Sequence, residues 1–143
     1  MTDITVTAAK VGLVDPVRDQ FGVRTARAAS TITKGQAVAE DTDGAVVPAD
    51  ASTGGAHLIQ FRGVALNGGG AGQAIDYAFD AELYGFTVSS LDAGALVYLS
   101  NTTGALADGA GEVNVPAGIV TALPDNAGTK ILRVVPSWLT VRA

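Results

Sequence analysis

The residue types that usually support catalysis are few and scattered in this chain of 143 residues. The single histidine, His57, begins an apolar stretch, where a lone histidine is more often structural than catalytic. Two carboxylate pairs, Glu40-Asp41 and Asp80/Glu82, flank expected turns, where solvation is their simplest role. The chain has no cysteine, which excludes disulfides and thiolate sites. We therefore expect no catalytic residue, no metal site and no cofactor.

Two short motifs resemble ligand-binding loops but are incomplete. Asp41-Thr42-Asp43-Gly44 has the first residues of a Ca²⁺ loop, yet no glutamate closes it at the required spacing. The glycine-rich stretch 67–72 lacks the Lys-Ser/Thr pair and the following helix of a phosphate-binding loop. Neither motif predicts a bound ion or nucleotide.

The elements around these residues follow a recurring phrase, a turn glycine followed by a small or polar residue and then an apolar residue. The phrase occurs in 32–38, 70–75 and 91–97. Turns every eight to twelve residues between short apolar runs predict an all-β sandwich or barrel. No convincing amphipathic helix is found. The expected strands are 36–40, 45–47, 57–66, 73–79, 83–88, 97–99, 113–122 and 130–135.

Turn chemistry adds detail to three of these strands. Asp43-Gly44 predicts a hairpin turn after the strand that ends at Glu40. Pro48 lacks a backbone N–H, so we expect it to end the pairing of the return strand. Gly63 interrupts the strongest apolar run and predicts a bend or β-bulge.

Composition predicts one domain with an unusual surface. Hydrophobic residues make up 48% of the chain and charged residues only 16%, and the mean hydropathy is +0.31. Small and polar residues must therefore cover much of the surface. A protein that is buried within a larger assembly can tolerate such a surface. The alternative is that the chain is a monomer whose composition is rich in small residues. No membrane-spanning run and no signal peptide are indicated, so we expect synthesis in a cytoplasm and no membrane partner.

Charge divides the chain into an N-terminal segment and a body. Up to Gln36 there are five basic and three acidic residues, and after it four basic and eleven acidic residues. Residues 1–31 also show neither a helical nor a strand period over most of their length, with one helical turn at most. We expect 1–31 to be an extended N-terminal arm and 32–143 to be the body. The acidic body argues against a nucleic-acid partner.

The arm supplies most of the candidate contact residues. Arg18, Arg24 and Arg27 would donate charge-assisted hydrogen bonds to a partner, and Phe21 would be an apolar anchor. Trp138, which follows the closing strand, fits either the core or a subunit interface. The alternative for 1–31 is that it completes the barrel as an edge strand.

The body resembles the phage capsid cement, or head decoration, proteins, of which the lambda-type proteins are a loose example. The resemblance lies in the order of its phrases and covers about three-quarters of the chain. The phrases are Lys34-Gly35-Gln36-Ala37-Val38, Gly44-Ala45-Val46-Val47-Pro48-Ala49, Phe61-Arg62-Gly63-Val64-Ala65-Leu66, Ala71-Gly72-Gln73-Ala74-Ile75, Leu91 to Leu99, Thr103-Gly104-Ala105-Leu106 and Pro116-Ala117-Gly118-Ile119-Val120.

The resemblance implies a small β-barrel of the β-clip or β-tulip type. It also implies a viral structural protein that is not an enzyme and that stabilises the capsid exterior of the virion. Its partners would be the major capsid protein and further copies of itself, commonly as homotrimers at local threefold positions. The arm could then add a strand to a capsid sheet. Two rival classes remain, a phage tail or fibre module and a β-clip ligand-binding or enzyme domain of the sugar-acid dehydratase or antifreeze-like kind.

Overall fold

The fold is built from short strands, as the turn spacing predicts. A computed structural model of the chain describes residues 2–52, 58–123 and 126–135. Its elements in chain order are η1 (Ala8–Lys10), β1 (Gly12–Leu13), α1 (Pro16–Asp19), η2 (Gln20–Gly22), β2 (Val23–Arg27), β3 (Ala37–Glu40), β4 (Val46–Pro48), β5 (Phe61–Ala65), β6 (Ala74–Ala78), β7 (Ala81–Tyr84), β8 (Leu96–Leu99), β9 (Leu106–Ala107), β10 (Pro116–Leu123) and β11 (Asn126–Val134).

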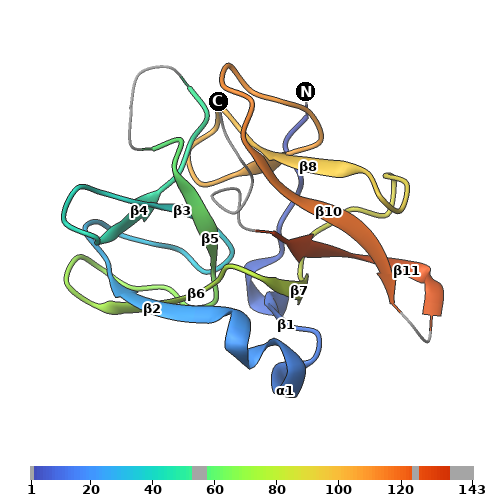
Figure 1. Ribbon diagram of the computed structural model, residues 1–143, viewed down its shortest axis with the longest axis horizontal. Helices are drawn as coiled ribbons and strands as arrows, with labels where there is room; N and C mark the ends of the chain where they lie inside the picture. Colours follow the sequence, from blue (N-terminus) through green and yellow to red (C-terminus); the bar gives the residue numbers. More distant parts are fainter. Residues whose placement is uncertain (1, 53–57, 124–125, 136–143) are drawn as a thin grey trace.

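The strands form two antiparallel sheets that lie side by side in Figure 1. The six-stranded sheet has the order β1-β7-β11-β10-β8-β9, and the five-stranded sheet has the order β2-β6-β5-β3-β4. An isolated bridge between Ala28 and Val46 joins the two edges of the five-stranded sheet at one point. No closed barrel is found in the part of the chain that the structure describes, which corrects the expected barrel to two antiparallel sheets.

Two apolar clusters fill the fold. The larger cluster lies between the sheets and includes Phe61 and Val64 from one sheet and Leu83 and Leu132 from the other. The smaller cluster lies on the opposite face of the five-stranded sheet. Its buried members are Ala28, Ile32, Val38, Val46, Ala65, Ile75 and Tyr77. The five-stranded sheet is therefore buried on both faces, which explains the nearly continuous apolar run in β3.

Residues 2–31 are part of both sheets, which corrects the expectation of an extended arm. Asp3 bridges Ala107 at one edge of the six-stranded sheet, and β1 pairs with β7 at the opposite edge. β2 then pairs with β6 in the other sheet over five residues. The segment therefore forms edge strands, as the alternative interpretation predicts. It carries α1 together with the 3-10 turns η1 and η2, which is more helix than the one turn expected.

The local turn predictions can be compared residue by residue. The hairpin between β3 and β4 is confirmed, with the Asp41 carboxylate accepting the backbone N–H groups of Asp43 and Ala45 at 2.9 and 3.0 Å. The bulge near Gly63 is also confirmed, since the β3–β5 register shifts between Val38 and Ala39.

β4 ends at Pro48, as expected, but the loss of a ladder hydrogen bond is not the reason. Pro48 lies opposite Val38 in β4, and the Ala49 N–H donates to the Ala37 carbonyl at 2.9 Å one residue further on. Because hydrogen-bonded pairs alternate along an antiparallel ladder, Pro48 occupies a non-hydrogen-bonded position. Its missing N–H therefore removes no bond between β3 and β4.

Candidate interaction surface

The corner between β1 and β2, formed by α1 and η2, is defined by local sequence. Asp15 is the N-cap of α1 and accepts the backbone N–H of Arg18 at 3.2 Å, and Pro16 occupies the first turn, where a missing N–H costs no bond. The Gln20 side-chain amide donates to the Val17 carbonyl at 2.9 Å. These contacts stabilise a helical turn that is too short to be stable alone.

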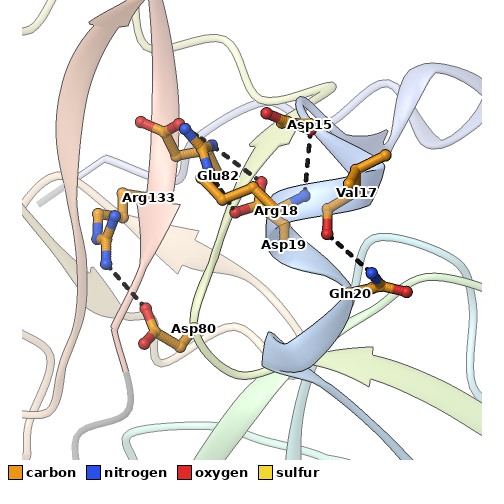
Figure 2. A network of polar contacts seen from close by, with 8 residues as sticks. All are labelled: Asp15, Val17, Arg18, Asp19, Gln20, Asp80, Glu82 and Arg133. Carbon is orange, nitrogen blue, oxygen red and sulfur yellow. Dashed lines mark hydrogen bonds and ion pairs between the residues drawn. The ribbon is translucent and has the colours of Figure 1, made fainter.

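An ion-pair network joins this corner to the six-stranded sheet (Figure 2). Arg18 donates through Nε and Nη2 to the Asp19 carboxylate at 3.0 and 3.1 Å, and through Nη2 to Glu82 of β7. Asp19 and Glu82 are buried, with 6% and 9% of their surface exposed. The two acidic side chains tolerate burial because they share one guanidinium.

The ionisation of these groups follows from the contacts. Burial acts to raise the pKa of Asp19, but the hydrogen bonds and charge of Arg18, with backbone hydrogen bonds, outweigh it and lower the pKa below the ordinary value. Hydrogen bonds to Asp19 and then Glu82 raise the pKa of Arg18. Asp19 and Arg18 are therefore both charged in the folded protein at neutral pH.

A close backbone contact places the end of the corner against the turn between β6 and β7. The Gly22 carbonyl accepts the N–H groups of Phe79 and Asp80 at 2.8 and 3.4 Å. A Cβ atom at Gly22 would lie 2.0 Å from the Asp80 carbonyl oxygen, so only glycine fits. The Asp80 carboxylate in turn pairs with Arg133 of β11 at 3.0 Å (Figure 2).

Two apolar side chains project from this braced corner into solvent. Val17 is 76% exposed and Phe21 is 82% exposed, the two highest values among the exposed large apolar side chains of the described chain. They lie four residues apart on consecutive helical turns. A rigid corner that presents a valine and a phenylalanine to water is typical of a contact surface.

The five residues expected to make contacts have different environments. Phe21 is exposed as an anchor would be, and Arg24 and Arg27 are exposed on β2. Arg18 binds Asp19 and Glu82 within the chain, so its guanidinium is engaged in folding contacts. Trp138 lies outside the described residues, as does His57.

The carboxylates singled out in the sequence have structural partners. Asp41 closes the β3–β4 turn, and Asp80 and Glu82 bind arginines. Glu40 lies 3.9 Å from Arg62 Nε and accepts a hydrogen bond from the Tyr77 hydroxyl at 3.4 Å. Over residues 2–52, 58–123 and 126–135, no group of three acidic or imidazole side chains is placed to hold a metal ion.

A hollow of about 200 Å³ lies on one face of the five-stranded sheet, across β2, β6, β5 and β3. It is lined by Arg24, Glu40, Arg62, Tyr77 and Phe79, and we call it the Arg24 pocket. Sequence reasoning missed it, because its residues come from four separate strands or their ends. The bulge signal at Gly63 was the available clue, since bulges change the direction in which a neighbouring side chain points.

Burial is the main influence on the pKa of Tyr77 in the Arg24 pocket. Tyr77 is 2% exposed. Burial raises its pKa, the charge of Arg24 opposes the rise, and Glu40 adds to it. The hydroxyl therefore stays protonated and can donate a hydrogen bond, while the two arginines and one glutamate give the pocket a net positive charge.

No protein-family model matches the chain, and no curated protein matches its sequence. No helix within the described ranges has the length and apolar character needed to cross a bilayer.

Proposed function

We propose that this chain is a phage capsid decoration protein, a structural protein that binds the outer surface of a capsid without covalent linkage. The observation that carries the proposal is the exposed pair Val17 and Phe21 on a corner fixed by buried ion pairs. Exposed apolar side chains on a rigid base lose little conformational entropy on binding, which favours a permanent contact. The order of short motifs in the body resembles that of the capsid cement proteins, and this resemblance is the reason for proposing a capsid as the partner.

The finer parts of the proposal concern fold type and assembly. We propose that the two sheets are a variant of the β-clip or β-tulip architecture and that copies assemble as trimers at local threefold positions on the virion. The low charge content of 16% supports burial of part of the surface in an assembly. In this proposal, the α1–η2 corner, with Arg24 and Arg27 beside it on β2, faces the major capsid protein.

The test is co-sedimentation with capsids of the phage that encodes the chain. The double variant Val17→Ser/Phe21→Ser should lose binding by at least about tenfold, because hot-spot residues contribute 2 kcal/mol or more. Leu96→Ser is the matched control, since Leu96 is 47% exposed but lies on β8, which is separated from β7 by β11 and β10. Both variants should unfold at the temperature of the unsubstituted protein.

Two results would contradict the proposal at different levels. Failure of the unsubstituted protein to bind capsids would overturn the decoration function. Electron cryomicroscopy that resolved single copies away from any threefold axis would overturn the trimeric arrangement and leave the function standing.

A further inference from the structure

The first observation is the free backbone edge of β2. Gly22, Arg24, Ala26 and Ala28 occupy the hydrogen-bonded positions of the β2–β6 ladder, because the Phe79 N–H donates to Gly22 and the Ala28 N–H donates to Gln73 in the same register. The N–H and C=O groups of Val23 and Thr25 therefore point away from β6. Within the described residues these groups have no backbone or side-chain hydrogen-bond partner.

The second observation is the position of the Arg24 pocket on one face of this edge. Arg24 lies opposite Tyr77 in the ladder, so both side chains are on the same face of the sheet. Arg62 reaches this face from the bulge in β5 and lies beside Glu40. Arg24 forms no ion pair with any described residue, so its guanidinium is available to bind a ligand in the pocket.

The positive charge around the β2 edge favours an acidic ligand. Arg27, at the end of β2, is exposed and likewise has no ion pair among the residues that the structure describes. A guanidinium prefers a carboxylate, with which it forms two parallel hydrogen bonds. An unpaired strand edge prefers an extended peptide, which completes the ladder.

We propose that β2 accepts an extended, acidic segment of a partner protein as an added strand. Its backbone pairs with Val23 and Thr25, and a glutamate or aspartate side chain on the Arg24 face enters the Arg24 pocket. There it accepts hydrogen bonds from the Arg24 guanidinium, while the Tyr77 hydroxyl keeps its hydrogen bond to Glu40. The inference deepens the proposed function by naming the chemistry of the capsid segment, and it rests on that function only for the identity of the partner chain.

The test uses the whole ¹⁵N-labelled protein and a capped peptide probe, acetyl-Thr-Glu-Val-Glu-Val-Thr-amide, at low salt. We expect weak binding, with a Kd on the order of 1 mM for so short a strand. Amide shifts should concentrate at Val23 and Thr25, and side-chain shifts at Arg24 and Arg62. The same peptide with lysine in place of glutamate should cause no shifts at these positions. Equal shifts with both peptides, or shifts elsewhere, would overturn the proposal.

Two pairs of variants separate the backbone and charge contributions. Thr25→Pro removes an outward N–H without touching the β2–β6 ladder and should weaken binding about fivefold, whereas Thr25→Val, which keeps the N–H, should not. Arg24→Glu should weaken binding at least about tenfold, whereas Arg27→Glu, outside the pocket, should have a smaller effect. The Arg24→Glu result decides the matter if Thr25→Pro fails to fold.

Other occupants and the capsid proposal give distinct results. Concentration-dependent shifts at Val23 and Thr25 without any peptide would mean that a second copy occupies the edge, and would overturn the assignment to an acidic partner. Peptide binding by a protein that does not bind capsids would remove the proposed function and leave this site standing. Capsid binding unchanged by Thr25→Pro and Arg24→Glu would remove the site and leave the function standing.

Discussion

Arg18 and Glu82 are 64 residues apart in the sequence and are joined by a hydrogen-bonded ion pair that connects α1 to β7. The same guanidinium also binds Asp19, so one cation serves two buried carboxylates. A second pair, Asp80 with Arg133, extends the connection to β11. The exposed α1–η2 corner is thus braced against the six-stranded sheet, although the strand that follows it, β2, belongs to the five-stranded sheet.

The first prediction concerns Asp19 and pH. The pKa of Asp19 is lower in the folded protein than in the unfolded chain, so the unfolded chain binds more protons near pH 4 and the stabilisation is lost as the pH falls. Asp19→Asn should therefore lower the free energy of unfolding by about 1–2 kcal/mol at pH 7 and by less at pH 3. Urea unfolding at both pH values measures the difference.

Asp92→Asn is the control for this measurement. Asp92 is exposed in a loop, and its side chain has no ion pair in the described part of the chain. The substitution should change stability by less than about 0.5 kcal/mol at either pH. A loss for Asp19→Asn that is independent of pH would show that packing, rather than charge, is responsible.

The second prediction concerns the contact between Gly22 and Asp80. Gly22→Ala places a methyl group 2.0 Å from the Asp80 carbonyl oxygen, and both partners are backbone, so the corner must move. We expect a loss of about 2 kcal/mol or more. Gly12→Ala is the matched control, because a Cβ there meets nothing within 4 Å. Equal transition midpoints for the two variants in thermal unfolding would contradict the contact.

Features that depend on neighbouring residues were predictable from the sequence. The β3–β4 hairpin forms because Asp41 caps its own turn, and the bulge near Gly63 forms where the apolar run is interrupted. Both signals lie within a few residues of the feature they specify. The all-β class follows in the same way, from turn chemistry repeated along the chain.

Features that depend on distant partners were not predictable. β2 shows no strand period because its two half-buried residues, Val23 and Ala26, lie on opposite faces of the strand, and its partner β6 lies about 50 residues further on. Arg18 binds its sequence neighbour Asp19, but the contact that ties it to the six-stranded sheet is with Glu82, which is remote in sequence and gives no local signal. The Arg24 pocket combines side chains whose common face depends on the bulged register of β5.

The third prediction concerns Tyr77. Burial raises the pKa of its hydroxyl, so above pH 10 the unfolded chain releases a proton that the folded protein retains, and stability falls as the pH rises. Tyr77→Phe should lose less stability between pH 8 and pH 11 than the unsubstituted protein. At pH 7 it should change stability by no more than about 1 kcal/mol, since its hydrogen bond to Glu40 is long, at 3.4 Å.

Tyr84→Phe is the control for that comparison, because Tyr84 is 42% exposed. Its stability should follow that of the unsubstituted protein over the same pH range. If Tyr77→Phe were as sensitive to alkaline pH as the unsubstituted protein, the buried hydroxyl would not be the group responsible.

The last prediction concerns the N-terminal segment. Deletion of residues 1–30 removes β1 and β2, and with them the core residues Ile4, Val11 and Ala28, which are at most 9% exposed. It also uncovers Leu106, whose carbonyl accepts the Ile4 N–H, and Phe86, which bridges Val6. We expect the deletion variant to lose its cooperative thermal transition and its near-ultraviolet circular dichroism. The milder variant Ile4→Ala should remain folded but lose about 2–3 kcal/mol of unfolding free energy.

A deletion variant with a native-like spectrum and a sharp transition would instead show that the segment is a detachable arm. If the deletion variant stays folded, its loss of capsid binding would show that the segment is a tether. If it unfolds, the same loss shows only that the protein is no longer folded. The binding tests therefore use substitutions at exposed positions.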